Sequence, residues 1–274
     1  MEIAGKVFVV TGGGNGIGRA VVLDLLARGA GVAAVDVSDA ALAQTVALAG
    51  NTGPRLTTHV VDLADRAAVE ALPQAVLTAH GQVDGVLNVA GIIQPFVPVK
   101  DLSYEDIEKV MAVNFSGVVN MCKTFVPYLL QRPAASLLNV GSMGGLSPVP
   151  GQSVYGASKA AVKLFTEGLY AELLGTPVAV TIVFPGAIAT NISANSGVGG
   201  ARDASEADGA MKTTTAQDAA RQIIAAVEKG AYRATVGSDA RMIDLLSRLM
   251  PRRTTEMVTK KMGAMLKSMA PSKA

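Results

Sequence analysis

The chain has 274 residues, of which 50% are hydrophobic and 17% charged, and its formal net charge at pH 7 is +2. This composition supports a large buried core and excludes a disordered chain, while the small net charge, without Lys/Arg clusters among aromatic residues, argues against a nucleic-acid partner. Cys122 is the single cysteine and only two histidines are present, so we expect no intramolecular disulfide, no bound metal and a reducing, cytoplasmic location.

The predicted elements alternate between strand and helix from the start of the chain, which has neither a basic leader nor an uninterrupted apolar run of membrane-spanning length. The expected strands are Val-rich and mostly continuous rather than alternating, which is typical of parallel sheets covered on both faces. They span 6–10, 31–36, 56–62, 83–89, 136–141, 178–184 and 232–237. Amphipathic segments between them predict helices over 16–28, 39–49, 65–79, 103–131, 153–174 and 216–229. The pattern predicts a doubly wound α/β fold: a seven-stranded, mostly parallel sheet with helices on both faces.

Two stretches depart from this alternation, and they suggest one catalytic domain over 1–238 followed by a helical extension over 239–274. Residues 191–215 are rich in Gly, Ala, Ser and Asp without a period, and predict a long loop that is either a lid over a substrate or an inert insertion. The extension holds 6 of the 11 methionines and predicts two helices broken near Pro251. Its apolar faces could pack on the body or on another subunit, or its basic side chains could lie on an anionic membrane.

A glycine-rich loop, "TGGGNGIGRA", follows the first predicted strand and leads into the first helix. Gly12, Gly16 and Gly18 are spaced so that a pyrophosphate can approach bare backbone N–H groups at a helix N-terminus. No Lys-Ser/Thr pair follows the glycines, which disfavours a nucleoside triphosphate loop, although a turn without any ligand remains the alternative. Asp36 ends the second strand, where a carboxylate can bind an adenosine ribose and favours NAD over NADP. Its alternative role is to cap the helix that begins near Ser38.

Tyr155 and Lys159 lie four residues apart in the helix predicted for 153–174, so their side chains project from one face. An ammonium group near a phenol favours the phenolate and lowers the phenol pKa, which allows acid–base chemistry near neutral pH. The alternative is an ordinary packed ring beside a lysine that extends to solvent. The pair alone therefore does not establish a catalytic site.

The motifs taken together resemble the short-chain dehydrogenase/reductase family. In chain order they are T-G-x-x-x-G-x-G at 11–18, "NVAG" at 88–91, Asn114, Ser142, Tyr-x-x-x-Lys at 155–159 and "PGAIAT" at 185–190. The resemblance covers residues 5 to about 237, and the joint occurrence of six motifs is far more specific than any single one. It implies a Rossmann-type fold, a nicotinamide dinucleotide cofactor and an assembly of two or four identical subunits.

The resemblance also implies catalytic roles for four residues. Tyr155 would exchange a proton with the substrate oxygen, and Ser142 would polarise the same oxygen. Lys159 would lower the pKa of Tyr155 and bind the nicotinamide ribose. Asn114 would hold a water that links Lys159 to solvent, the alternative being an asparagine merely tolerated in a helix.

Other positions take cofactor and substrate roles by the same resemblance. Asp62 and Leu63 would contact the adenine, residues 88–91 would line the cofactor floor, and the Ile188 backbone and Thr190 hydroxyl would hold the carboxamide. Val89 replaces the more usual second asparagine of that motif, a change expected to alter only local hydrogen bonds. The full cofactor set is Gly12, Asn15, Gly16, Ile17, Gly18, Asp36, Asp62, Leu63, Asn88, Ala90, Gly91, Tyr155, Lys159, Pro185, Gly186, Ile188 and Thr190. The substrate set is Gln94, Phe96, Ser142, Met143, Gly144, Val149 and Gln152, with Gly145 and Leu146 beside them.

These features predict NAD-dependent hydride transfer between the nicotinamide and a secondary alcohol or ketone. The substrate set is mostly apolar and uncharged, which favours a substrate of modest polarity over a phosphorylated sugar. Arg202 or Lys212 from the long loop could add charge to that pocket. Two other functions stay open: a regulatory dinucleotide-binding protein without chemistry, and an epimerase or dehydratase that retains NAD without net redox turnover.

Overall fold

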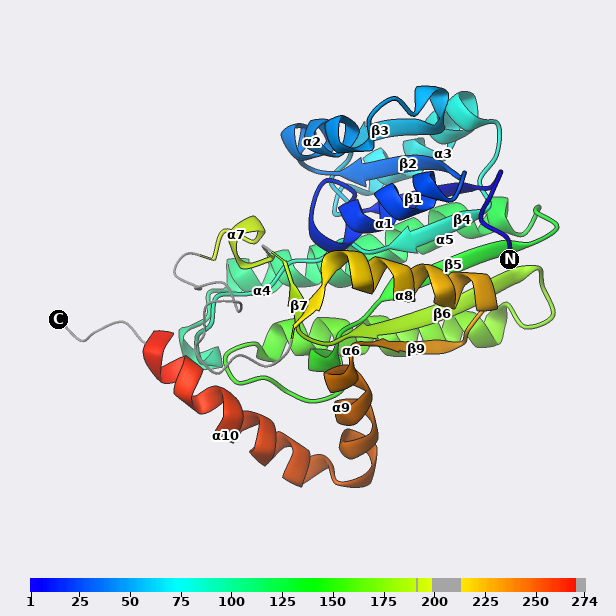
Figure 1. Cartoon of the computed structure of the whole chain (residues 1–274). Coiled ribbons are helices and arrows are strands. Elements are labelled where there is room, and N and C mark those ends of the chain that lie inside the picture. The colour runs from blue at the N-terminus through cyan, green and yellow to red at the C-terminus, as the bar shows by residue number, and fades with distance from the viewer. Residues whose placement is uncertain (191, 199–212, 270–274) are drawn as a thin grey trace.

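Seven parallel strands form the central sheet in the order β3-β2-β1-β4-β5-β6-β9 (Figure 1). The computed structural model describes residues 1–190, 192–198 and 213–269. The strands are β1 (Val7–Thr11), β2 (Gly31–Asp36), β3 (Leu56–Val60), β4 (Gly85–Asn88), β5 (Ala135–Val140), β6 (Val178–Pro185) and β9 (Arg233–Val236). The predicted doubly wound fold is confirmed. The first and last residues of each predicted strand lie within two residues of the observed ends. Every ladder of this sheet is parallel.

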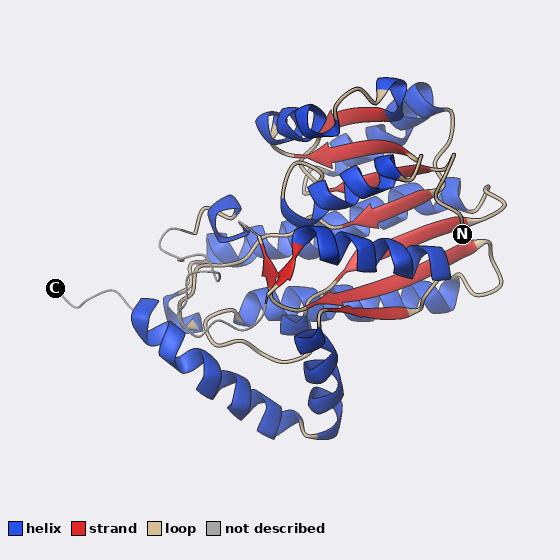
Figure 2. Cartoon of the chain, viewed as in Figure 1, coloured by secondary structure: helices blue, strands red, loops and turns tan. Residues whose placement is uncertain are grey.

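Helices cover both faces of the sheet, as Figure 2 shows. One layer consists of α1 (Gly16–Ala27), α2 (Asp39–Ala49) and α8 (Ala216–Lys229). The other consists of α3 (Arg66–His80), α4 (Tyr104–Met111), α5 (Gly117–Leu129) and α6 (Ser153–Glu172). Two buried clusters result, one on each face, with Leu25, Leu42 and Ile223 in the first and Val76, Phe125 and Val162 in the second. Because both strand faces are buried, the continuous apolar strand sequences follow directly from this layering.

The helix predicted over 103–131 is divided by a π-helical turn, Ala112–Ser116, between α4 and α5. The chain stays helical, but the extra residue rotates the side chains on either side of the turn relative to a regular helix. Single π-helical turns inside α-helices occur frequently at functional sites. Asn114 lies at the centre of this turn and is fully buried.

Residues beyond the sheet form small elements and the C-terminal extension. They are β7 (Ile188–Ala189), α7 (Ile192–Asn195), β8 (Thr214–Thr215), α9 (Ser238–Leu249) and α10 (Pro251–Met269). The extension therefore consists of two helices that meet at Met250 and form the V at the base of Figure 1. Arg233 ties α9 to the body through ion pairs with Asp244 and with Glu167 of α6. None of the helices in the described ranges combines the length and apolarity needed to cross a bilayer.

Candidate active site

The glycine-rich loop joins β1 to α1 at the carboxyl edge of the sheet. Gly12 has a φ of 70°, which favours glycine, and a Cβ there would lie 3.0 Å from the Ala90 Cα. A Cβ on Gly18 would overlap the Gly12 carbonyl oxygen. Asn15 caps α1, its Oδ1 accepting a hydrogen bond from Gly16 N at 2.9 Å. These close approaches leave bare backbone at the start of α1, which is the surface that a pyrophosphate requires.

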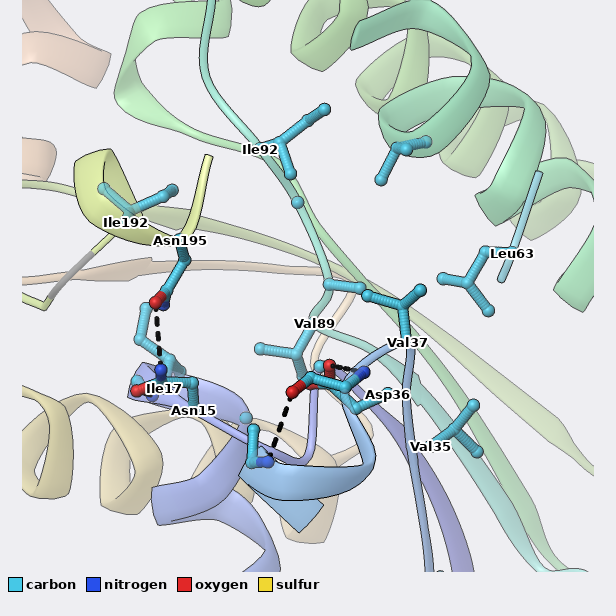
Figure 3. Close-up of a pocket in the computed structure, with 18 of the residues that line it drawn as sticks. Asn15, Ile17, Val35, Asp36, Val37, Leu63, Val89, Ile92, Ile192 and Asn195 are labelled. Atoms are coloured by element: carbon cyan, nitrogen blue, oxygen red, sulfur yellow. Dashed lines mark hydrogen bonds between the residues drawn. The ribbon is translucent and has the colours of Figure 1, made fainter. Parts of the chain in front are cut away.

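A cavity of about 640 Å³ opens above this loop, between the ends of β1, β2, β3 and β4 (Figure 3). It lies where the strand order reverses, between β1 and β4, which is the usual ligand position in open α/β sheets. Most of the predicted cofactor residues line it: Gly12, Asn15, Gly16, Ile17, Gly18, Asp36, Asp62, Leu63, Ala90, Gly91 and Thr190. The glycine cradle and the volume of the cavity fit a dinucleotide.

Six predicted cofactor residues do not line this cavity, and the expected role of Asn88 needs correction. The Asn88 side chain is buried and donates from Nδ2 to Oδ1 of Asn139 at 2.8 Å, with the buried Cys122 thiol alongside. The alternation of side chains along β4 turns Asn88 into the core, so Val89, Ala90 and Gly91 form the floor. The other five residues are Tyr155 and Lys159, which are described below, and Pro185, Gly186 and Ile188. Pro185 closes β6, Gly186 lies against Asp239, and Ile188 pairs with Thr214.

Asp36 faces the cavity with both carboxylate oxygens engaged by the backbone. Oδ2 accepts from Gly14 N at 3.0 Å and Oδ1 accepts from Ser38 N at 3.1 Å. Ser38 itself caps α2 by accepting from Ala41 N, so the alternative role of Asp36 as the helix cap is wrong. The carboxylate instead fixes the edge of the glycine loop and stays in the cavity wall.

Two cations lie at or near the cavity, and the sequence analysis did not single out either. The Arg19 guanidinium is engaged by the Gly14 carbonyl, Thr45 Oγ1 and Gln44 Oε1 beneath the loop. Lys109 lines the cavity from α4 and is exposed. Only the packing of α4 over the sheet edge places Lys109 there, because nothing local in the sequence relates it to the glycine loop.

Ser142 and Tyr155 are brought together beside Gly144. A Cβ on Gly144 would lie 3.4 Å from both Ser142 Oγ and the Cε1 atom of Tyr155. Ser142 follows β5 and caps the 3₁₀ turn Met143–Gly145, its Oγ accepting from Gly144 N at 3.0 Å. Tyr155 lies in the first turn of α6. The two hydroxyl-bearing side chains therefore converge although 13 residues separate them in the sequence.

Lys159 and Asn114 meet beside Gly91 at the cavity wall. A Cβ on Gly91 would lie 3.0 Å from Lys159 Nζ and 3.3 Å from Asn114 Oδ1. Lys159 is buried, and its Nζ donates to the Val140 carbonyl oxygen at 3.0 Å. Asn114 accepts from Ile92 N and donates to the Ile92 carbonyl oxygen, both at 2.9 Å, and also donates to Ser158 Oγ. Asn114 is therefore a structural link between helix and cavity floor, and the alternative of a merely tolerated asparagine is wrong.

The electrostatics differ from the sequence-based expectation at Tyr155. Burial raises the pKa of the Tyr155 phenol, and the nearby Ser142 hydroxyl opposes that rise. Burial also lowers the pKa of Lys159 to about 8. Removal from water disfavours both charged forms, and the Lys159 ammonium is directed to the Val140 carbonyl. The lowered Tyr155 pKa expected from its neighbour is thus not present in this geometry.

The predicted substrate residues surround the Ser142 and Tyr155 pair, with one correction. Gln94 is fully buried, and its side-chain amide is hydrogen-bonded to backbone groups of residues 151, 154 and 155. It therefore serves the protein backbone rather than a substrate. Gln152 is also buried and donates to the Gln94 carbonyl oxygen at 2.7 Å. Gly144 is buried, whereas the remaining members, Phe96, Met143 and Val149, are half-buried in the same region.

Part of the predicted lid over 191–215 can be placed. Residues 199–212, including Arg202 and Lys212, lie outside the described residues. The described residues 192–198, which include α7, are bonded to the cavity rim at two points that the sequence did not indicate. Asn15 Nδ2 donates to Asn195 Oδ1 at 3.0 Å (Figure 3), and Ile93 N donates to Ser196 Oγ at 3.0 Å. The segment after β7 thereby contacts both the glycine loop and the cavity floor.

Comparison of the sequence with known proteins identifies related chains. A family model described as short chain dehydrogenase matches residues 6–198. The SadH protein of Mycobacterium tuberculosis, whose name describes it as an oxidoreductase, is 40% identical over 252 residues, which cover 90% of this chain and 91% of SadH.

Two solved structures show the same arrangement of elements. The structure of a short chain dehydrogenase/reductase from Burkholderia phymatum in complex with NAD matches with a TM-score of 0.82 and 28% identity, covering 92% of this chain and 96% of that one. A short chain dehydrogenase from Burkholderia cenocepacia in complex with NADP matches with a TM-score of 0.78 and 26% identity, covering 94% and 99%. Both dinucleotides thus occur among the structural relatives.

Proposed function

The chain belongs to the short-chain dehydrogenase/reductase family, and we propose that it transfers a hydride between NAD and a secondary alcohol or ketone of modest polarity. The observation that carries this proposal is the convergence of Ser142 and Tyr155 across Gly144, with Lys159 one helical turn along and beside the cavity wall. A protein that only bound the dinucleotide would not need two hydroxyl-bearing side chains and a buried amine at that position.

The residues that would hold NAD are among those that line the cavity. The loop 12–18 would hold the pyrophosphate, Asp36 the adenosine ribose, residues 62–63 the adenine and Thr190 the carboxamide. When bound, NAD supplies the hydride acceptor or donor at its nicotinamide ring. Orientation of the two reactants in a dry site would contribute much of the rate.

The chain's own side chains would move the proton. In the oxidation direction, the Tyr155 phenolate oxygen takes the hydroxyl proton of the alcohol as the carbinol carbon gives up its hydride. Ser142 Oγ donates a hydrogen bond to the same substrate oxygen and orients it. The Lys159 ammonium, which is directed to the Val140 carbonyl oxygen in this structure, would turn toward Tyr155 and stabilise the phenolate as it forms. Its buried position would make that interaction stronger than it is in water. In the reduction direction, Tyr155 returns the proton.

A preference for NAD over NADP is part of the proposal and rests on Asp36. Its carboxylate lies in the cavity wall, where a 2′-phosphate would meet a like charge. At a separation of about 5 Å and an effective dielectric between that of a protein surface and water, the repulsion is about 1–3 kcal/mol per unit charge. We expect NAD to bind at least tenfold more tightly than NADP.

The cofactor preference can be tested by calorimetric titration of both nucleotides. Asp36→Ser should reduce the NAD preference at least tenfold, mainly by tightening NADP binding. Asp39→Ser removes a carboxylate from the first turn of α2, outside the cavity lining, and is the matched control. Equal affinity of the wild type for NAD and NADP would contradict the assignment.

The reaction itself is tested by incubating the protein with NAD and a panel of secondary alcohols while recording NADH absorbance. Tyr155→Phe should lower turnover at least a thousandfold and leave the NAD dissociation constant within about threefold, because it removes only the proton-transferring oxygen. Tyr104→Phe changes a tyrosine that is 79% exposed and should behave as the wild type. An active Tyr155→Phe variant would refute the mechanism, and NAD binding without any turnover would favour the non-redox alternatives. The substrate, the compartment and the number of subunits stay predictions.

A further inference from the structure

The helix that carries Tyr155 begins without a cap of its own. Gln152 occupies the N-cap position of α6, and its side chain makes no capping hydrogen bond. The first turn of a helix leaves backbone N–H groups without partners inside the helix, and a polar side chain usually accepts from the second or third of them. In α6 those two donors belong to Val154 and to Tyr155 itself.

Both donors are satisfied by a residue 60 positions away in the sequence. Gln94 Oε1 accepts from Val154 N at 2.8 Å and from Tyr155 N at 2.9 Å. Its Nε2 donates to the Gly151 carbonyl oxygen at 3.0 Å, which fixes the orientation of the amide. The Gln94 side chain is fully buried, so these bonds are shielded from competition by water.

Gln94 belongs to the same segment that forms the cavity floor. Gly91 and Ile92 line the cavity, and Asn114 holds both backbone groups of Ile92, so this segment is fixed immediately before Gln94. The Gln152 side chain adds a second link between the two segments: its Nε2 donates to the Gln94 carbonyl oxygen at 2.7 Å. The first turn of α6 is thereby joined to the cavity floor by hydrogen bonds rather than by apolar packing alone.

We propose that Gln94 is a positioning residue for Tyr155: it supplies the cap that α6 lacks and fixes the phenol relative to the cofactor floor and Ser142. This inference rests on the proposed function of Tyr155 in proton transfer. A displacement of about 1 Å at a reacting group can cost about a hundredfold in rate. Loss of the cap is therefore expected to affect turnover more than it affects nucleotide binding.

The first test measures the hydrogen bonds without substrate or cofactor. Amide exchange followed by NMR should show protection of the Val154 and Tyr155 N–H groups in the wild type, although amides in the first turn of a helix normally exchange fast. Gln94→Leu should accelerate both at least tenfold. Gln94→Glu loses the donor to the Gly151 carbonyl oxygen but retains an acceptor for both N–H groups, and should preserve most of the protection. Fast exchange of both amides in the wild type would overturn the proposal.

The second test measures the consequence for the reaction. Gln94→Leu should lower kcat about 10- to 100-fold with the NAD dissociation constant within about threefold of the wild type. Gln94→Glu should recover most of kcat at high pH. It should also shift the rising limb of the pH profile of kcat/KM to higher pH, by about one unit. The reason is that a carboxylate beside the Tyr155 amide disfavours the phenolate and so raises the pKa of the phenol. The other groups that act on Tyr155 in these variants, the Lys159 amine and the Ser142 hydroxyl, are unchanged.

Asp65→Ala is the matched control for loss of a cap. Asp65 Oδ1 accepts from the N–H groups of Ala67 and Ala68 at the start of α3, so the variant loses two comparable bonds on another helix. It should lower the melting temperature without moving the pH profile. A Gln94→Leu enzyme with the wild-type kcat and pH profile would overturn the proposal, as would a Gln94→Glu profile without a shift.

The outcomes for Gln94 and for the proposed function can be told apart. If the wild type oxidises alcohols and Tyr155→Phe does not, but Gln94→Leu is unimpaired, only the inference about Gln94 fails. If the wild type shows no NAD-linked turnover, the proposed function fails, and amide exchange still decides whether Gln94 holds the first turn. Should Gln94→Leu fail to fold, Gln94→Glu supplies both the exchange and the pH measurements.

Discussion

Replacement of Lys159 by methionine is expected to make the protein more stable near neutral pH while it abolishes activity. Lys159 is buried, and its pKa falls to about 8 from the usual 10.5 because burial disfavours the ammonium. Methionine has a similar unbranched shape and no charge. The substitution therefore removes an unfavourable buried charge together with the group that is proposed to assist proton transfer.

The size of the effect follows from the pKa. Each unit of difference between folded and unfolded pKa corresponds to about 1.4 kcal/mol, so holding Lys159 charged in the folded protein costs about 3 kcal/mol below pH 8. Loss of the amine also leaves the Val140 carbonyl oxygen without its 3.0 Å partner, which costs about 1–2 kcal/mol. The net expectation is a gain of about 1–2 kcal/mol in the free energy of unfolding at pH 7.

The stability advantage of Lys159→Met over the wild type should decrease as the pH rises. The folded-state pKa of Lys159 lies below the unfolded value, so between about pH 8 and 10.5 the unfolded chain binds more protons than the folded one. The stability of the wild type therefore rises over that range as the buried amine loses its proton. The advantage of Lys159→Met should shrink from pH 8 upward and vanish near pH 9. By about pH 10.5 the variant should be about 1–2 kcal/mol less stable than the wild type, because only the loss of the bond to the Val140 carbonyl oxygen then remains.

Urea unfolding of the nucleotide-free protein, followed by circular dichroism at pH 7 and pH 10, measures the difference directly. Lys163→Met is the matched control, since Lys163 is one turn along the same helix and pairs with Glu167 nearer the surface; it should be neutral or slightly destabilising at both pH values. A Lys159→Met variant less stable than the wild type at pH 7, or equally stabilised at pH 7 and pH 10, would refute this reasoning.

Two further predictions concern the glycine cradle and the histidines. Gly18→Ala places a methyl group on the Gly12 carbonyl oxygen and should weaken NAD binding at least a hundredfold by calorimetry; unaltered binding would show that the cradle does not hold the nucleotide. His59 and His80 both contact the Thr57 hydroxyl, and burial lowers both pKa values. Since their folded pKa values lie below the unfolded value of about 6.5, stability should fall as the pH drops through 6.5, and His59→Gln/His80→Gln should flatten that part of the stability profile in urea unfolding experiments.

The sequence by itself determined the layered fold and the placement of the main motifs. Continuous Val-rich strands mark a sheet covered on both faces, and spacing by four puts Tyr155 and Lys159 on one helix face. The glycines at 12 and 18 were identifiable because close backbone approach excludes any side chain there. These features depend on local chemistry or on simple periodicity, which a single sequence displays.

Only the tertiary structure decided how distant polar groups pair. Whether Gln94 meets a substrate or caps the catalytic helix depends on where a loop after β4 lies relative to α6, and no local pattern records that distance. Asn88 likewise faces Asn139 in the core because of the pairing of β4 with β5. The pKa of Tyr155 depends on burial as well as on its neighbour, and burial is set by the whole packed edge of the sheet. Periodicity fixes which face a side chain takes, whereas its partners are fixed only when separate elements pack together.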